Sequence, residues 1–254
     1  MNVTGKVAVV AGGASGLGRA VCTHLGQAGA SVAVLDRDGI GATALAAELP
    51  AAIGIEADVA DAGAVERALD RTLAEFGAVH IGVNTAGVVD AARIVSRRGP
   101  AALDDFERVV RINLCGTFNV MRVAVAAMLA NEPDEDGERG VMINTASGAA
   151  YDGQSGQAAY SASKAGVIGL ALPVARDLAG TGVRVNTIAP GLFETPMTGS
   201  LPDRVRTGIE QTLVEPSRMG RPEEFARMVR SIVENGYLNA ECIRLDAAVR
   251  PPAR

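Results

Sequence analysis

Tyr160 and Lys164 are the residues in this sequence whose types and spacing best fit the movement of a proton. A separation of four residues places both side chains on one face of a helix. A free phenol has a pKa of ~10 and is too weak a base at neutral pH, but a neighbouring ammonium group favours the phenolate and lowers that pKa. A Tyr-x-x-x-Lys pair alone is more often structural than catalytic, so other residues must support this interpretation.

Ser147 comes just after the apolar segment 141–145, which is expected to be a buried strand. Parallel sheets bind ligands beyond the carboxyl ends of their strands, so a hydroxyl at this place can meet a substrate. It could orient a substrate oxygen and share the charge that develops there. Ser147 therefore supports a catalytic interpretation of Tyr160 and Lys164.

A glycine-rich segment, AGGASGLG, follows the first apolar segment and precedes an expected helix. Its residues Gly12, Gly16 and Gly18 allow a tight turn. A pyrophosphate could then approach the helix N-terminus, where free N–H groups and the helix dipole favour an anion. The alternative is an ordinary glycine-rich turn, but the place between a strand and a helix favours a dinucleotide site.

Asp36 stands at the end of the second apolar segment. A carboxylate there could accept hydrogen bonds from both hydroxyls of an adenosine ribose and would repel a 2′-phosphate, which favours NAD over NADP. Arg37 argues in the other direction, because its guanidinium could pair with such a phosphate. Asp36 could also be a turn or helix-capping carboxylate. We expect NAD as the cofactor.

Short apolar segments alternate with longer helical ones along the whole chain. The expected strands lie at 7–10, 32–35, 51–57, 79–83, 141–145, 183–188 and 242–245, and clear helices at 17–27 and 157–178. Continuous apolar strands separated by helices indicate a parallel sheet covered on both faces, whereas the alternation expected of an antiparallel α+β fold is rare here. The sequence therefore predicts one α/β domain over residues 1–254, a Rossmann-like doubly wound parallel sheet of about seven strands.

Three segments depart from this alternation. Residues 93–100 are basic and residues 131–140 are acidic, and both are expected to be surface loops. Residues 192–218 contain several prolines and predict a mobile loop with short helices. The helix at 157–178 has no polar face, so it should be buried on two sides and contact another subunit, and Pro173 could kink it.

The composition limits the kinds of protein that this chain can be. Hydrophobic residues make up 48% of it and the net charge is -5, which supports a large core and argues against nucleic acid or anionic lipid as a partner. The three cysteines lie far apart and only two histidines are present besides, so no metal site is predicted. We see no signal peptide and no run of about 18 apolar residues, and we expect a cytoplasmic protein without a membrane span.

Several motifs, in the right order, resemble those of the short-chain dehydrogenase/reductase family over essentially the whole chain. They are the GGASGLG turn, Asp58-Val59, Asn84-Thr85-Ala86-Gly87, Asn113, Ser147, Tyr160-Ser161-Ala162-Ser163-Lys164 and Pro190-Gly191. Within the family the chain is most similar to the type-2 3-hydroxyacyl-CoA dehydrogenases, also called type-10 17β-hydroxysteroid dehydrogenases. The distinctive stretches are NEPDEDGERGVMINTAS, GQAAYSASK, TIAPGLF and IRLDAAVR. The chain departs from the family pattern at Ala11, Thr85 and Ala247, where Thr, Asn and Gly are common.

The resemblance implies an NAD-dependent oxidoreductase that interconverts a secondary alcohol and a ketone, with 3-hydroxyacyl-CoA and 3-oxoacyl-CoA as the leading pair. A hydroxysteroid or another bulky alcohol is the alternative, and a dinucleotide-binding scaffold without catalysis is a remote one.

Tyr160 would be the base, helped by the positive charge of the nicotinamide, and Lys164 would also hold the nicotinamide ribose. Ser147 would orient the substrate, and Asn113 would anchor a water that links Lys164 to solvent. Without the resemblance, Asn113 could equally be a surface residue of a helix. A homotetramer is also implied.

The resemblance further implies which residues line the cofactor cleft. These are Gly12, Ser15, Gly16, Leu17, Gly18, Asp36, Asp58, Val59, Asn84, Ala86, Gly87, Tyr160, Lys164, Pro190, Gly191 and Thr195. Asp58 and Val59 should flank the adenine, although Asp58 could instead cap the following helix.

The expected substrate contacts are Ser147, Gln154, Tyr160, Leu192 and Phe193. Gln154 could meet a thioester or a ketone, or lie exposed in a loop. An apolar set predicts a lid over an apolar substrate, or packing against the neighbouring helix. It consists of Leu192, Phe193, Met197, Leu201 and Leu213. The phosphates of a CoA ester could be bound by Arg93, Arg97 and Arg98 or by Arg204 and Arg206, unless these side chains are simply solvated.

Overall fold

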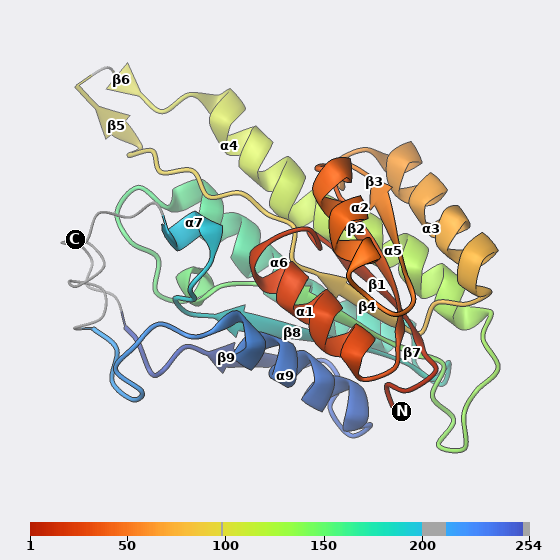
Figure 1. Cartoon of the computed structure of the whole chain (residues 1–254). Coiled ribbons are helices and arrows are strands. Elements are labelled where there is room, and N and C mark those ends of the chain that lie inside the picture. The colour runs from red at the N-terminus through yellow and green to blue at the C-terminus, as the bar shows by residue number, and fades with distance from the viewer. Residues whose placement is uncertain (98, 200–211, 251–254) are drawn as a thin grey trace.

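The computed structural model describes residues 1–97, 99–199 and 212–250. Its main sheet has seven strands in the order β3-β2-β1-β4-β7-β8-β9, and all neighbouring pairs are parallel (Figure 1). The strands are β1 (Val7–Ala11), β2 (Ser31–Asp36), β3 (Ala52–Glu56), β4 (Ile81–Asn84), β7 (Gly140–Thr145), β8 (Val183–Pro190) and β9 (Cys242–Leu245). The predicted doubly wound sheet is confirmed, and every expected strand is present.

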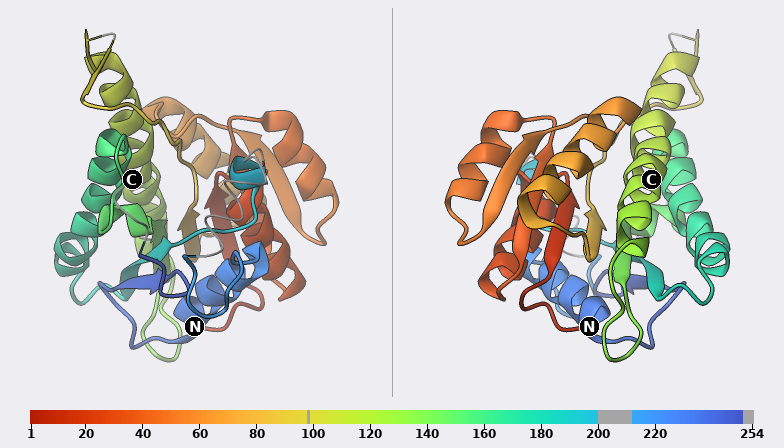
Figure 2. Two further views of the ribbon diagram at one scale, coloured as in Figure 1. Left: turned by 90° about the vertical axis from the view of Figure 1, so that its left-hand side faces the viewer. Right: turned by 90° about the vertical axis from the view of Figure 1, so that its right-hand side faces the viewer.

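Two apolar cores cover the two faces of the sheet, because side chains alternate along each strand. Ala8 and Val10 of β1 belong to one core, and Val9 and Ala11 belong to the other. The first core lies under α1 (Gly16–Gln27), α2 (Gly39–Ala47) and α9 (Pro222–Glu234), and the second under α3 (Ala62–Phe76), α5 (Gly116–Leu129) and α6 (Ala158–Asp177). Figure 2 shows these two helical layers on opposite sides of the sheet. The loops at the carboxyl ends of the strands are therefore left to build a site.

Both expected surface loops contain structure that the sequence analysis did not predict. Within the segment 93–100, β5 (Val95–Ser96) and β6 (Gly99–Pro100) pair antiparallel and project from the body beside α4 (Leu103–Val110) (Figure 2). In the segment 131–140, Glu138 is buried and pairs with Arg184 of β8 and with the N-terminal amine. A buried guanidinium needs such a counter-charge, so this segment is not only a surface loop.

Two helical runs are long and apolar enough to cross a membrane, by length and composition alone. They are Leu103–Leu129, with a mean hydropathy of 1.5, and Ala158–Asp177, with a mean hydropathy of 1.2. The sequence analysis looked for uninterrupted apolar runs and did not find them, because polar residues are scattered through both. Helices that cover a buried sheet have the same composition; 50% of the apolar window of the first run and 22% of that of the second are buried within the fold. The two runs are therefore weak evidence for a membrane span.

Candidate active site

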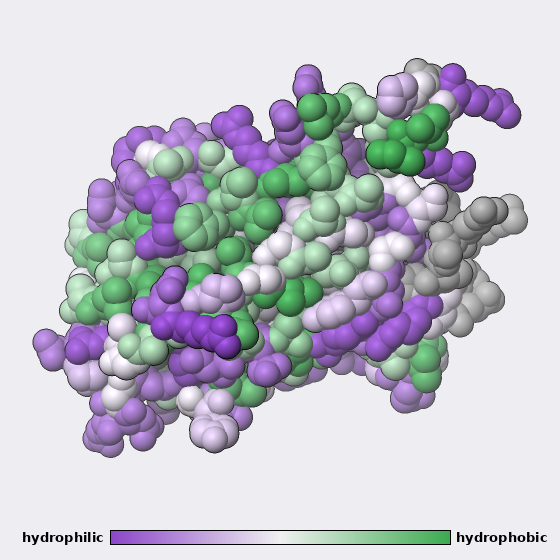
Figure 3. All heavy atoms as spheres, turned by 180° about the vertical axis from the view of Figure 1, so that it is seen from behind, coloured by the Kyte–Doolittle hydropathy of each residue, from purple (hydrophilic) through white to green (hydrophobic). Residues whose placement is uncertain are grey.

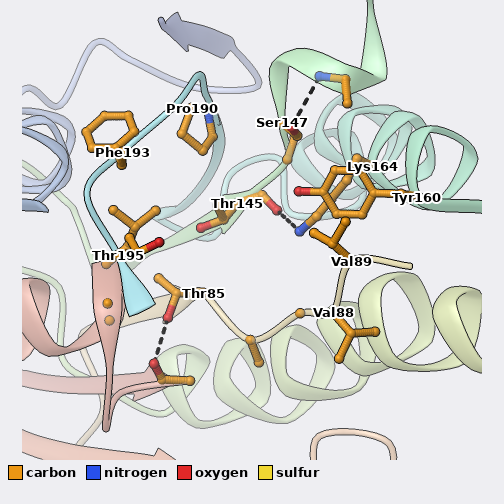
Figure 4. Close-up of a pocket in the computed structure, with 18 of the residues that line it drawn as sticks. Thr85, Val88, Val89, Thr145, Ser147, Tyr160, Lys164, Pro190, Phe193 and Thr195 are labelled. Carbon is orange, nitrogen blue, oxygen red and sulfur yellow. Dashed lines mark hydrogen bonds between the residues drawn. The ribbon is translucent and has the colours of Figure 1, made fainter. Parts of the chain in front are cut away.

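A cavity of about 780 Å³ opens at the carboxyl ends of β1, β4, β7 and β8 (Figure 4). It lies beside the boundary between β1 and β4, where the order of the strands reverses and where doubly wound sheets bind their ligands. Every predicted cofactor and substrate residue lines this cavity except Asn84. Among the predicted catalytic residues, Tyr160, Lys164 and Ser147 line it and Asn113 does not.

The glycine turn fits a phosphate group because it is packed tightly on one side and open on the other. Gly12 has a φ of 75°, and a Cβ there would lie 2.6 Å from the backbone nitrogen of Ala86. A Cβ on Gly18 would overlap the carbonyl oxygen of Gly12. Ser15 precedes α1 and its side chain makes no capping hydrogen bond, which leaves the N-terminus of the helix available to an anion.

Thr85 joins this turn to the loop after β4. Its hydroxyl lies 2.8 Å from the carbonyl oxygen of Ala11 and 3.1 Å from that of Gly12, and it donates to them. The sequence analysis found Ala11 where a hydroxyl residue is common. Thr85 supplies a side-chain hydrogen bond to the turn, so Ala11 does not leave the turn without one.

Asp36 and Asp58 lie at the end of the cavity where an adenosine would be bound. The two oxygens of Asp36 accept hydrogen bonds from the backbone N–H groups of Ala14 and Asp38, each at 3.0 Å. Asp36 is therefore a turn carboxylate that can also accept from a ribose, because each of its oxygens has a second lone pair. Asp58 accepts from the N–H of Ala60, while Asp61 caps α3, so the capping alternative for Asp58 is wrong.

Asn84 does not line the cavity, contrary to the sequence prediction. Its side chain is buried and donates to Asn144 Oδ1 at 2.9 Å and to the carbonyl oxygen of Thr117 at 3.1 Å. Successive side chains of a strand point to opposite sides, and the side chain of the next residue, Thr85, points toward the cavity. Asn84 therefore connects β4 to β7 and α5 and supports the site from the interior.

Asn113 is fully buried in a turn of π-helix, η1 (Arg111–Cys115), so a surface position is excluded. Its Oδ1 accepts from the N–H of Val88 at 2.8 Å, and its Nδ2 donates to the carbonyl of Val88 at 2.9 Å and to Ser163 Oγ at 3.1 Å. Ser163 in turn donates to the carbonyl of Tyr160 at 2.7 Å. Asn113 thus connects the loop after β4 to the first turn of α6.

Tyr160 and Lys164 extend from α6 into the cavity, toward the end of β7 (Figure 4). The Ser147 side chain lies near enough to the Tyr160 hydroxyl to lower its pKa by hydrogen bonding. The Nζ atom of Lys164 lies 5.9 Å from the centre of the Tyr160 ring and donates to the carbonyl of Thr145 at 2.8 Å. Ser147 itself begins the short 3-10 helix η2 (Gly148–Ala150), where its Oγ accepts from the N–H of Ala149. A phenol, an ammonium group and a hydroxyl therefore meet at one place.

Comparison with known proteins agrees with this arrangement, since residues 6–206 match the model of the short chain dehydrogenases. The chain belongs to the short-chain dehydrogenase family. It is 49% identical over 252 residues to 3-hydroxyacyl-CoA dehydrogenase type-2 of Homo sapiens, covering 98% of this chain and 97% of that protein. The protein of the same name from Bos taurus is 48% identical over 252 residues, with the same coverage. The crystal structure of 3-hydroxyacyl-CoA dehydrogenase type-2 from Mycobacterium avium superposes with a TM-score of 0.94 at 40% identity, covering 98% of both chains.

Short-chain dehydrogenases are oxidoreductases that act on CH–OH donors with a nicotinamide dinucleotide, and the residues of this chain fit that group. The turn needs glycine at positions 12 and 18, because Cβ atoms there would clash with the backbone of Ala86 and of Gly12, and the tight turn so formed can bring its backbone close to a pyrophosphate. At Gly87, farther along the cleft, a Cβ would lie 3.2 Å from Asn113 Oδ1 and 3.4 Å from Lys164 Nζ, so a larger residue would crowd these two side chains. The cleft therefore has a phosphate end, at the glycine turn, and a reactive end, at Tyr160.

Burial sets the charge of the two central groups of this dehydrogenase. It raises the pKa of Tyr160, and the hydrogen bond with Ser147 opposes that rise only in part. Burial lowers the pKa of Lys164 to about 8. In the chain by itself the pKa of Tyr160 is raised, because desolvation of the phenolate outweighs the effect of Ser147; the expected lowering also depends on the charge of the nicotinamide and stays a prediction. At neutral pH the pair is a neutral phenol beside a mostly charged lysine.

The substrate end of the cleft is apolar, but its apolar residues are only in part a lid. Phe193 lines the cavity, yet its ring packs edge-on against Phe225 of α9 with the ring centres 6.2 Å apart. The alternative of packing against a helix is therefore correct for Phe193. Leu192 and Gln154 line the cavity, whereas Leu213 is buried elsewhere. Leu201 and the side chain of Met197 lie outside the described part of the chain.

Arg244, Asp152 and Val249 line the cavity and were not predicted. The sequence held one signal for Arg244, its position near the carboxyl end of an expected strand. The arginines proposed for CoA phosphates are not at the cavity where they can be described: Arg93 and Arg97 are exposed and do not line it. The others, Arg98, Arg204 and Arg206, lie outside the described residues.

Proposed function

We propose that this dehydrogenase oxidises 3-hydroxyacyl-CoA to 3-oxoacyl-CoA with NAD. The observation that carries the proposal is the meeting of Tyr160, Ser147 and Lys164 at one end of a cavity that has Asp36 at the other. The similarity to proteins named 3-hydroxyacyl-CoA dehydrogenase type-2 supports the choice of substrate.

The three polar residues divide the proton chemistry among them. Ser147 and Tyr160 present two hydroxyls, so that the substrate oxygen can be oriented by one and lose its proton to the other. The Lys164 ammonium and the positive charge of a bound nicotinamide would together favour the phenolate that takes this proton, against the burial that raises the pKa of Tyr160 in the chain by itself. A bound nicotinamide dinucleotide would accept the hydride from the substrate carbon that carries this oxygen. Asn113 is proposed to anchor a water that links Lys164 to solvent, since a Cβ on Gly87 would lie close to both side chains.

The preference for NAD over NADP is proposed on the basis of charge. Asp36 lines the cleft, where its carboxylate would repel a 2′-phosphate. Arg37 also lines the cleft, but it is exposed, and water and salt screen the charge of an exposed guanidinium.

We also propose that the protein is a homotetramer in the cytoplasm. The helical layer of α4, α5 and α6 leaves apolar side chains exposed, and Figure 3 shows apolar surface on the face opposite to that of Figure 1. Such side chains favour association between subunits. They include Leu103, Phe106, Phe118, Leu129 and Leu172. Light scattering counts the subunits, and a monomer would contradict the proposal.

The free thiols suit a reducing compartment such as the cytoplasm, and cell fractionation tests this location.

A second candidate substrate is a hydroxysteroid or another bulky alcohol, which the apolar walls at Val89, Leu192 and Phe193 favour. The experiment incubates the purified protein with NAD and either 3-hydroxybutyryl-CoA or a hydroxysteroid and follows the absorbance of NADH. Turnover of the CoA ester supports the proposal. Turnover of the steroid alone would contradict the proposed substrate, and dinucleotide binding without turnover of any alcohol would favour a scaffold.

A further inference from the structure

Arg244 occupies the substrate end of the cleft and connects several of its walls. It lies on β9 and lines the cavity. Its Nη2 is 2.7 Å from Asp152 Oδ2, and its Nε is 2.7 Å from Asp246 Oδ2. The same Nη2 donates to the carbonyl of Val249 at 3.4 Å, and the guanidinium carbon lies 5.0 Å from the centre of the Tyr151 ring.

Each partner of Arg244 belongs to a different wall. Asp152 follows the short 3-10 helix that Ser147 begins, so its position is tied to that of the Ser147 hydroxyl. Asp246 packs against the loop after β8, where a Cβ on Gly191 would lie 2.7 Å from the Cβ of Asp246. Val249 belongs to the C-terminal segment and is buried against the cavity. One guanidinium therefore joins the Ser147 wall, the Gly191 wall and the C-terminal segment.

The burial of these groups makes the contacts stronger than ordinary surface ion pairs. The side chains of Arg244 and Asp246 are 22% and 7% exposed, and that of Asp152 is 32% exposed. Arg250 also approaches both carboxylates, at 3.2 and 3.6 Å, but its side chain is 55% exposed. Loss of the Arg244 charge would leave the Asp246 carboxylate poorly compensated at the cavity wall.

We propose that Arg244 is a positioning residue for the substrate end of the site: it sets the place of Ser147 relative to Gly191. The adenosine and pyrophosphate end of the cofactor cleft is built by Asp36, Asp58 and the glycine turn, and none of these is among the contacts of Arg244; Gly191 was expected at the nicotinamide end only. Its removal is therefore expected to disturb the alcohol more than the dinucleotide. The proposal uses the proposed function only for the choice of a test substrate.

The first test compares Arg244→Met with Arg230→Met, which removes an ion pair to Glu234 on α9, away from the cavity. For Arg244→Met we expect kcat/KM for 3-hydroxybutyryl-CoA to fall about tenfold to hundredfold, because a small misplacement of reacting groups has effects of that size. The Kd for NAD should stay within twofold. Arg230→Met should change neither quantity. An Arg244→Met enzyme with unchanged kcat/KM would overturn the proposal, and so would a Kd for NAD weakened as much as kcat/KM.

The second test needs no substrate and reports the walls directly by amide hydrogen exchange. The N–H of Ala149 donates to Ser147 Oγ at 3.1 Å, and the N–H of Gly191 donates to the carbonyl of Leu245 at 2.9 Å. In Arg244→Met both amides should exchange faster, and in Arg230→Met neither should. Asp152→Asn, which keeps the shape of the side chain, should speed the exchange of the Ala149 amide and leave that of the Gly191 amide unchanged. Unchanged protection of both amides in Arg244→Met would overturn the proposal, and so would unchanged protection of the Ala149 amide in Asp152→Asn. If the wild type fails to oxidise the CoA ester but these exchange rates change as stated, only the proposed substrate is wrong.

Discussion

The Lys164 ammonium group donates to the carbonyl oxygen of Thr145 at 2.8 Å, in a position where the lysine side chain is almost fully buried. Burial lowers the pKa of Lys164 to about 8, far below the ordinary value of 10.5. The fold therefore carries a charged group at neutral pH that its own interior disfavours. Function rather than stability explains such a residue.

Lys164→Met is expected to stabilise the cofactor-free protein while abolishing oxidation. A lowering of the pKa from 10.5 to about 8 corresponds to about 3 kcal/mol, and loss of the hydrogen bond to Thr145 offsets part of it. We expect the free energy of unfolding at pH 7 to rise by about 1–3 kcal/mol, measured by urea denaturation.

The pH dependence of this difference has a defined sign. Between pH 8 and 10.5 the unfolded lysine binds more protons than the folded one, so the wild type gains stability from this group as the pH rises. The advantage of Lys164→Met should therefore shrink over that window. Lys6→Met is the matched control, because Lys6 is only partly buried, and it should change stability by less than about 0.5 kcal/mol. A destabilised Lys164→Met would contradict the account of this burial.

Asp36→Asn is expected to shift the dinucleotide preference toward NADP. The substitution removes the charge that would repel a 2′-phosphate and leaves Arg37 beside it. We expect the ratio of the Kd values for NADP and NAD to fall at least about tenfold, or about 1.4 kcal/mol, in binding titrations. Asp38→Asn is the control: it removes the same charge two residues away, from a side chain that caps α2 and does not line the cleft. An unchanged ratio of the two Kd values in Asp36→Asn would show that Asp36 does not contact the adenosine ribose.

Ser163→Ala is expected to loosen the connection between the β4 loop and the turn of α6 that carries Tyr160. Ser163 accepts from Asn113 and donates to the carbonyl of Tyr160, so the variant loses two buried hydrogen bonds. We expect kcat to fall about tenfold and the Val88 amide to exchange faster. Ser161→Ala lies on the same helix and removes a buried hydroxyl for which the structure shows no hydrogen-bond partner, so it should leave both quantities unchanged. Equal effects of the two substitutions would show that Ser163 has no special role.

The sequence predicted the sheet and most of the residues that line the cavity, because both depend on local patterns. Continuous apolar strands such as Val7–Ala11 are buried on both faces, and only glycine fits where Gly12 and Gly18 approach their neighbours. These requirements act on single residues and their immediate surroundings. They are visible in the chain without knowledge of the fold.

The sequence could not predict features that depend on contacts between distant residues. Asn84 and Thr85 look equally suited to the cleft, and only the register of β4 turns Asn84 inward. Arg244 meets Asp152, which is 92 residues away, and although Arg244 lies near the carboxyl end of an expected strand, nothing in the sequence indicates that the two residues meet. Ala247 has a φ of 49°, in the left-handed region that favours glycine, which gives a physical reason why glycine is common there.

The most direct test of the whole account is the rate of 3-hydroxybutyryl-CoA oxidation by Tyr160→Phe, measured by NADH absorbance together with the Kd for NAD. The ring and its packing remain, and only the hydroxyl that meets Ser147 is lost. We predict a fall in kcat of at least about a thousandfold, because general-base catalysis and its alignment are both lost, with the Kd for NAD within about threefold. A Tyr160→Phe enzyme that oxidises this substrate at the wild-type rate would contradict the central claim that Tyr160 takes the proton.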